Sequence, residues 1–201
     1  MKASFFTGVS RICCDLFLNF AKMPLLSFGS ALPSFSVPLE TNLFRMNYHF
    51  QAHRQVRKNL LEILQNCSMQ DLMLIPDGFN NNIYWNIAHA VATQQLLCYY
   101  LSGNPFRIDK YWIETYKKGT LPNLNVQQSE VDDLAFLLIE TSKILLKDYD
   151  ADFFSEYTPY TTSFGLDLKN IQDAIIFNNM HESLHFGYAM AQKRAILGEQ
   201  F

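Results

Sequence analysis

Apolar residues recur every three or four positions in four long segments of this chain, residues 48–67, 80–103, 129–149 and 169–197. This period places apolar side chains on one face of an α-helix, whereas a half-buried strand would alternate apolar and polar residues. In the second segment the spacing is carried by Ile83, Ile87, Ala90, Val91, Gln94, Leu97 and Leu101. The pattern predicts an all-α protein with four main helices, which is typical of a four-helix bundle.

The segments between these helices differ in length and in composition. Residues 68–79 contain a proline and a glycine and are predicted to form an irregular connector. The next crossover is predicted to carry one short extra helix near residues 109–117. Residues 150–168 are rich in aromatic residues and could hold a short hairpin, but we predict a loop. Ser129, which precedes acidic residues, is the predicted N-cap of the third helix.

The first 45 residues follow neither a helical nor a strand period and are apolar and rich in Ser and Pro. We predict that residues 1–45 are a disordered or non-native N-terminal extension and that one domain spans residues 46–201. The alternative is a signal or transit peptide, although Arg11 and Asp15 interrupt its apolar core. Sequencing the N-terminus of the native product distinguishes these hypotheses, and an intact Met1 would contradict a natural start at Met46.

Composition and charge narrow the classes of partner. Hydrophobic residues make up 49% of the 201 residues and charged residues 17%, with a net charge of −3 and a pI near 5.9. This balance predicts a folded domain and gives no electrostatic reason to expect nucleic acid or an anionic membrane as a partner. No apolar run is long enough for a transmembrane helix. Four cysteines are too sparse for a disulfide framework, so we expect a cytoplasmic protein.

Three of the five histidines fall on apolar helical faces. His181 and His185 lie four positions apart, which places both imidazoles on one side of a helix. His89 lies on the apolar face of the second helix. Three inward imidazoles would suit Zn²⁺, Ni²⁺ or Fe²⁺ and leave an open coordination position. The alternative is that these are core histidines with ordinary hydrogen bonds. His49 and His53 form a second such pair, but the solvated start of a helix makes them weaker candidates.

The segment HESLH, residues 181–185, matches the H-E-x-x-H signature of zinc peptidases. That site needs a third ligand downstream, yet the residues after His185 contain no histidine, and Gly187 stands one position too early for the extended signature. The third ligand would therefore have to be His89, which is not the peptidase arrangement. We treat a metallopeptidase as a minor alternative, in which Glu182 lies beside the metal or, equally, on the surface.

Two motifs together resemble the DinB-like superfamily. The first is N-x-x-W-N-I-x-H-x-x-x-T-x-x-x-L in residues 82–97, and the second is H-E-x-L-H-x-G-Y in residues 181–188. The resemblance covers residues 46–197 and implies a four-helix bundle with up-down-down-up topology. It also implies a divalent metal held by three histidines, which correspond here to His89, His181 and His185.

The same resemblance extends, at a distance, to metal-dependent bacillithiol transferases and to mycothiol-dependent maleylpyruvate isomerase. It implies a thiol S-transferase that joins a low-molecular-weight thiol to a small electrophile, with the metal lowering the pKa of the thiol. Such an enzyme should have a pocket beside the triad, with polar groups such as Asn86, Asn178 or Tyr160. The alternative is a non-catalytic, stress-related metal-binding module, whose triad would be closed over by side chains such as Trp85, Trp112 or Phe177.

The third helix carries more apolar residues than one face requires, because residues 136–139 are all large and apolar. A wide core face would explain this run. A seam between two copies of the chain would explain it as well, and we expect a homodimer.

Overall fold

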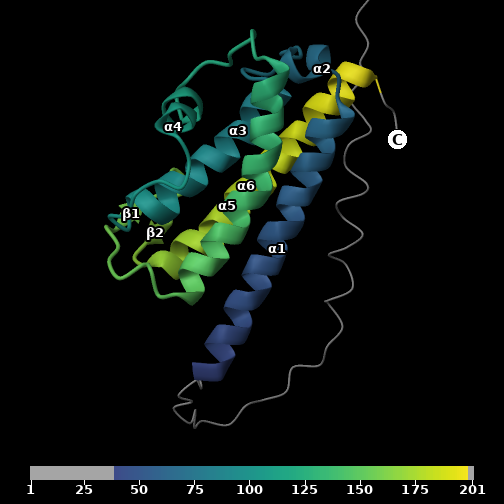
Figure 1. Cartoon of the computed structure of the whole chain (residues 1–201). Coiled ribbons are helices and arrows are strands. Elements are labelled where there is room, and N and C mark those ends of the chain that lie inside the picture. The colour runs from purple at the N-terminus through teal and green to yellow at the C-terminus, as the bar shows by residue number, and fades with distance from the viewer. Residues whose placement is uncertain (1–38, 199–201) are drawn as a thin grey trace, which may run out of the picture. The chain divides into compact units, whose positions relative to one another are not determined.

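A computed structural model describes residues 39–198, with side chains from Met46 onward (Figure 1). The described part is mostly helical, as the apolar period predicts, and its only strands form one two-stranded sheet. Residues 1–38, most of the predicted N-terminal extension, lie outside the described range, so the predicted domain boundary at residue 46 stays a prediction. Helix α1, Leu39–Asn66, begins earlier than the predicted residue 48. Residues 39–47 contain neither proline nor glycine, so nothing in them stops a helix.

The connector after α1 contains a short helix that the sequence analysis missed. Helix α2 spans Met69–Met73 and begins with a capping box. The Ser68 hydroxyl accepts a hydrogen bond from the Asp71 N–H at 3.2 Å, and the Asp71 carboxylate accepts one from the Ser68 N–H at 3.2 Å. These bonds satisfy two N–H groups that a helix start leaves free, and the S-x-x-D spacing could have predicted them.

The predicted helix over residues 80–103 is divided into α3, Ile83–Gln94, and a π-helical segment η1, Gln95–Tyr100. Helix α3 starts late because the Asn82 side chain caps it by accepting a hydrogen bond from the Trp85 N–H at 2.8 Å. The short helix of the crossover is confirmed as α4, Lys110–Tyr116.

Helix α5, Gln128–Asp150, starts differently from the prediction. Ser129 lies within its first turn, and the cap is Gln127. The Glu130 carboxylate reaches back to accept a hydrogen bond from the Gln127 N–H at 3.2 Å. Ser129 already has helical neighbours on both sides, so it cannot act as the N-cap, which is the residue that precedes the first helical position.

The predicted loop over residues 150–168 is wrong in one part. Strands β1, Tyr160–Thr161, and β2, Asp167–Leu168, pair antiparallel. Gly165 turns the chain between them with a φ of +76°, which favours glycine. Helix α6, Ile171–Leu197, follows directly, because the Asn170 side chain caps it through the Asp173 N–H at 2.8 Å.

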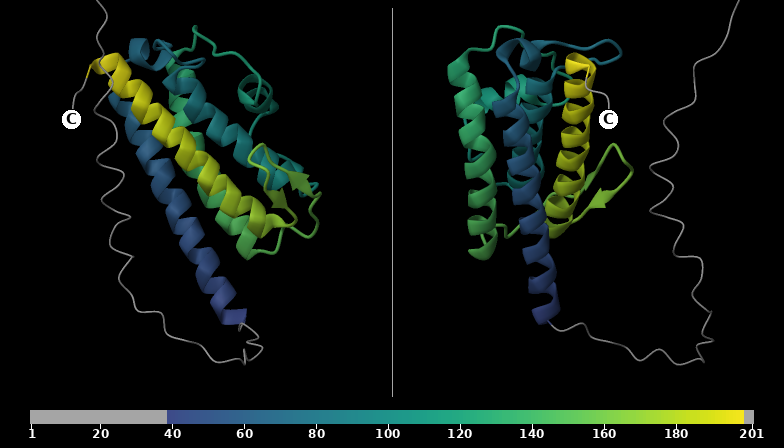
Figure 2. Two further views of the ribbon diagram at one scale, coloured as in Figure 1. Left: turned by 180° about the vertical axis from the view of Figure 1, so that it is seen from behind. Right: turned by 90° about the vertical axis from the view of Figure 1, so that its right-hand side faces the viewer.

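The long helices pack side by side, with α1 against α5 and α6, and with α3 against α6 (Figure 2). Fully buried apolar residues such as Leu60 on α1, Ile87 on α3 and Leu138 on α5 form the core between them. The α3–α6 contact brings the middle of α3 next to the HESLH segment. Within residues 39–198, no helix combines the length and the apolar character needed to cross a bilayer.

Candidate metal centre

The three histidines selected from the sequence lie together in space. His89 comes from α3, whereas His181 and His185 come from successive turns of α6. One ring nitrogen from each lies within 4.8 Å of the others. The centroids of the rings are 4.5 Å apart for His181 and His185 and 4.7 Å apart for His89 and His185. At these separations the three imidazoles can converge on a single ion.

The ring of His89 is held in place by its neighbours. Its Nδ1 lies 2.6 Å from the Tyr116 carbonyl oxygen at the end of α4. A carbonyl only accepts, so Nδ1 carries the proton and Nε2 keeps its lone pair. The Thr93 hydroxyl lies 3.2 Å from that Nε2, and the Trp85 ring stacks on the imidazole at 4.5 Å with an interplanar angle of 9°. The tautomer and the ring orientation therefore suit a ligand that binds through Nε2.

His185 is oriented by a buried amide network. Its Nδ1 lies 2.8 Å from the Asn86 Oδ1. The Asn86 amide donates to the Gln192 Oε1 at 2.8 Å and to the Asn82 carbonyl at 3.0 Å, so its oxygen must face His185. Nδ1 of His185 is therefore the donor, and its Nε2 lies 3.2 Å from Nε2 of His181. Of these partners, the sequence pointed to Asn86 as a nearby polar group but not to Gln192 or Tyr116.

The protonation of the cluster also suits a metal ion. Burial, followed by the nearby His89, lowers the pKa of His181 to about 4. Burial and the two other histidines lower the pKa of His185 to about 2, and burial is also the main cause that lowers the pKa of His89. All three rings are neutral at pH 7, which is the form that binds a metal. The buried Nδ1 of His181 has no hydrogen-bond partner within residues 39–198, so this nitrogen can still form one hydrogen bond.

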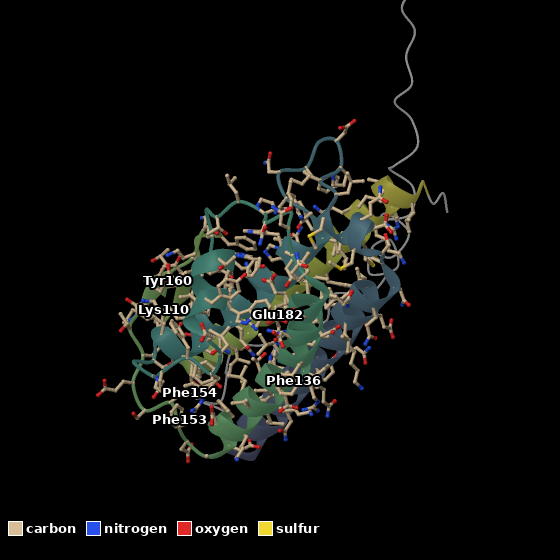
Figure 3. The ribbon with its side chains drawn as sticks, turned by 45° about the horizontal axis from the view of Figure 1, so that its top comes forward. Lys110, Phe136, Phe153, Phe154, Tyr160 and Glu182 are labelled. Carbon is tan, nitrogen blue, oxygen red and sulfur yellow. The ribbon has the colours of Figure 1, made fainter. Side chains whose placement is uncertain are left out.

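Glu182, the glutamate of HESLH, is not on the surface (Figure 3), and its carboxylate is not among the groups that cluster as metal ligands. Its side chain is fully buried, and both carboxylate oxygens accept hydrogen bonds from the Arg57 guanidinium, at 2.6 Å and 2.7 Å. Asn178 donates to the same carboxylate at 2.7 Å. Burial alone would raise the pKa of Glu182, but the positive charge of Arg57 and the contact with His53 outweigh it and lower that pKa. This carboxylate is therefore not available to activate a metal-bound water.

His53 belongs to the same buried network, which corrects the expectation that it lies in a solvated helix end. It is only 1% exposed, and its ring nitrogens lie 3.1 Å from Glu182 and 3.0 Å from the Ser142 hydroxyl on α5. The structure does not bring His49 or His53 into the cluster of three histidines. This buried polar network links α1, α5 and α6, the helix that also carries His181 and His185.

A groove reaches the triad at His185. It has a volume of about 770 Å³ and lies between residues 78–81, the start of α3 and one side of α6. Trp85 and Asn86 line it, as does Tyr188. Asn178 is instead bound to Glu182, and Tyr160 lies on the hairpin. Trp85 and Phe177 lie close to the rings of His89 and His181, so the triad is covered on one side and accessible at His185.

Comparison with known proteins agrees with the two sequence motifs. A search of curated proteins finds no match to this chain. The family profile described as the DinB superfamily matches residues 52–189, a range that contains α3, the HESLH segment and all three clustered histidines. By this match over more than half of its length, the chain belongs to the DinB superfamily.

Proposed function

We propose that His89, His181 and His185 bind one divalent metal ion, Zn²⁺, Ni²⁺ or Fe²⁺. The observation that carries this proposal is the convergence of three neutral imidazoles from two helices, with ligand nitrogens within 4.8 Å. The hydrogen bonds from Nδ1 of His89 and His185 place the ring proton on Nδ1, so Nε2 of each ring keeps a lone pair that can bind the ion. An all-imidazole set suits these borderline metals and does not suit Mg²⁺ or Ca²⁺, which prefer oxygen ligands.

We further propose that the protein is a metal-dependent transferase that joins a low-molecular-weight thiol to a small electrophile. The thiol sulfur would form a bond to an electrophilic carbon, and the thiol proton would go to the leaving group that departs from that carbon or, in an addition or ring opening, to the product itself. Three protein ligands leave a coordination position for the thiol, and the groove at His185 provides a path to it. The metal, when bound, would supply a thiolate at neutral pH by lowering the pKa of the thiol. The protein would orient its own ligands through Tyr116 and Asn86 and hold the electrophile in the groove.

A panel assay tests this activity. The zinc- and nickel-loaded proteins are each incubated with small thiols and electrophiles, and consumption of the electrophile is followed by mass spectrometry. We expect turnover with at least one pair, and its loss in metal-free protein and in the His89→Ala variant. A fully loaded protein that is inert with every pair contradicts the transferase.

The second candidate is a non-catalytic metal-binding module. It is favoured by the depth of His89, which is 5% exposed and covered by the Trp85 ring. This candidate predicts that the protein binds one metal ion per chain and shows no turnover in the same panel.

The peptidase alternative lacks support, because the only glutamate of its signature is bound to Arg57. We expect no fragments when the metal-loaded protein is incubated with casein.

Replacing Asn86 tests how the protein orients His185 as a ligand of the metal ion. We expect Asn86→Ala to weaken metal affinity by about 10- to 100-fold, because His185 loses the acceptor that fixes its tautomer and ring orientation. The measurement is competition with a chelator of known affinity. Asn80→Ala is the matched control, because Asn80 lies in the adjacent connector and forms no hydrogen bond with the triad. Equal affinities of the two variants would contradict this role.

Two features of assembly are also proposals. We infer the up-down-down-up bundle topology, and the colours in Figure 2 support it, since α1 and α6 run one way and α3 and α5 the other.

We also propose a homodimer with a seam at Phe136, which is 64% exposed on α5 (Figure 3). Light scattering that gives a monomer mass at high concentration would contradict the dimer.

A further inference from the structure

We propose that the groove beside His185 binds an uncharged aromatic molecule, and that this molecule is the electrophile of the proposed transferase. The role of the molecule as electrophile rests on the proposed function. The binding site itself rests on the walls of the groove, on their lack of charge and on the polar groups at its rim.

The walls of the groove include several apolar and aromatic side chains. Leu184 and Tyr188 lie one turn apart on α6 and are 42% and 47% exposed. Phe79 meets Tyr188 edge-to-face across the groove, with ring centroids 6.1 Å apart, and Trp85 also lines it. Aromatic rings side by side favour a further flat ring through stacking and edge contacts. A volume of about 770 Å³ lies within the usual range for small-molecule sites.

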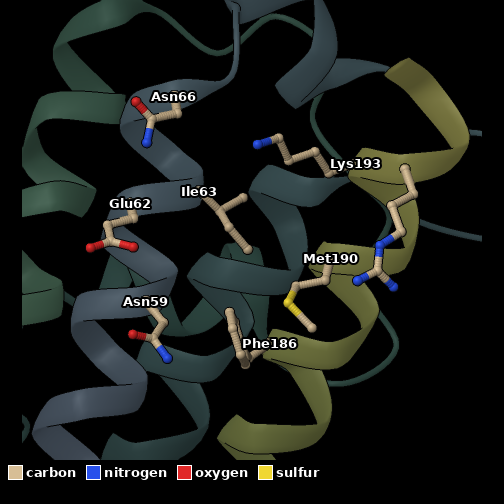
Figure 4. Close-up of a pocket in the computed structure, with 8 residues that line it drawn as sticks. Asn59, Glu62, Ile63, Asn66, Phe186, Met190 and Lys193 are labelled. Atoms are coloured by element: carbon tan, nitrogen blue, oxygen red, sulfur yellow. The ribbon is translucent and has the colours of Figure 1, made fainter. Parts of the chain in front are cut away.

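Among the residues that the structure describes, no Lys, Arg, Asp or Glu lines this groove. A second cavity of about 430 Å³, on another side of α6, is different, because Glu62, Lys193 and Arg194 line it (Figure 4). A carboxylate or sulfonate entering the first groove would lose hydration without gaining a counter-charge, which is costly. A metal ion at the triad would add positive charge only at the His185 end, where the thiolate of the proposed reaction would bind. The remainder of the groove therefore selects an uncharged ligand.

The polar groups of the groove also differ in their availability. Both ends of the Asn86 amide, and the Oδ1 of Asn81, are used in the network with Gln192 and His185. Asn80 lines the same groove and is exposed, and its side-chain amide makes no hydrogen bond within the described part of the chain. It can donate to or accept from one carbonyl, hydroxyl or ether group of a bound molecule. The expected ligand thus combines an aromatic ring with one neutral polar group.

Two fluorescent probes with the same ring skeleton test this inference. N-phenyl-1-naphthylamine is neutral, and 8-anilino-1-naphthalenesulfonate adds one sulfonate. Both are titrated into the full chain, metal-free and metal-loaded, and probe emission and tryptophan quenching are measured. We expect the neutral probe to bind at one site, at least about tenfold more tightly than the sulfonate, because the groove offers the anion no partner.

Variants locate the site of the probe. Tyr188→Ala should weaken binding of the neutral probe at least about fivefold by removing an aromatic wall. Ala191→Arg, which adds a positive charge to the groove, should raise the affinity for the sulfonate. Met190→Ala is the matched control, since Met190 lies on the same helix but lines the second cavity. Equal binding of both probes, or greater sensitivity to Met190→Ala than to Tyr188→Ala, would overturn the inference.

Failure of this inference and failure of the proposed function give different results. Probe binding by metal-free protein tests the groove alone, whereas metal content and thiol transfer test the triad. A groove that binds the neutral probe in a protein that takes up no metal supports the site and contradicts the transferase. A loaded, active protein whose groove binds neither probe contradicts only the present inference.

Discussion

Replacing His89 by alanine is expected to reduce bound metal from near one equivalent per chain to near zero. The same loss is expected for His185→Ala, although the two residues lie on different helices. Two remaining imidazoles at this site could hold an ion only with added water, which lowers affinity by orders of magnitude for a borderline metal. Elemental mass spectrometry on purified protein gives the stoichiometry directly.

The shared loss is the informative part of that experiment, because it requires one site that spans α3 and α6. His49→Ala is the matched control, since His49 lies outside the cluster and its replacement should leave metal content unchanged. Retention of metal in His89→Ala, with loss only in His185→Ala, would show that HESLH binds metal without α3. The peptidase alternative would then need to be tested again.

Replacing Arg57 by leucine is expected to lower the free energy of unfolding of metal-free protein by about 3–5 kcal/mol, because an unpaired carboxylate is left in the interior. Arg57 and Glu182 are both fully buried, and the guanidinium donates two hydrogen bonds to the carboxylate. His53 and Asn178 also contact this carboxylate, but neither supplies a permanent positive charge. Urea unfolding followed by circular dichroism measures the change.

A double variant separates the lost ion pair from lost packing. Arg57→Leu combined with Glu182→Leu removes both charges, and we expect it to be more stable than Arg57→Leu alone. Lys143→Ala is the surface control, because the Lys143–Glu140 pair is exposed and such pairs contribute about 0–1 kcal/mol. A loss for Arg57→Leu no larger than for Lys143→Ala would contradict the structural role of this network.

The sequence predicted the parts of the site that depend on local spacing. The interval between His181 and His185 places both rings on one helical face, and the apolar period around His89 turns that ring inward. Their convergence depended on the resemblance between the two motifs and the family, since spacing alone does not say which helices are neighbours. The structure confirms the convergence.

The parts that the sequence did not predict depend on tertiary contacts. Gln192 accepts a hydrogen bond from Asn86, although the two residues are 106 positions apart in the sequence. The Tyr116 carbonyl accepts one from His89, which is 27 positions away. No periodicity marks such partners. The burial of Arg57 and Glu182 was equally hard to predict from the sequence, because charged side chains are expected at the surface unless a partner of opposite charge is known. The capping box at Ser68, by contrast, was a local signal that could have been used.

In the proposed centre, three imidazoles from α3 and α6 hold one metal ion and leave one coordination position open. X-ray absorption spectroscopy of the zinc-loaded protein tests it most directly. We expect three imidazole nitrogens and one further light atom, at about 2.0–2.1 Å from zinc. A shell with sulfur, or with fewer than three imidazoles, would contradict it.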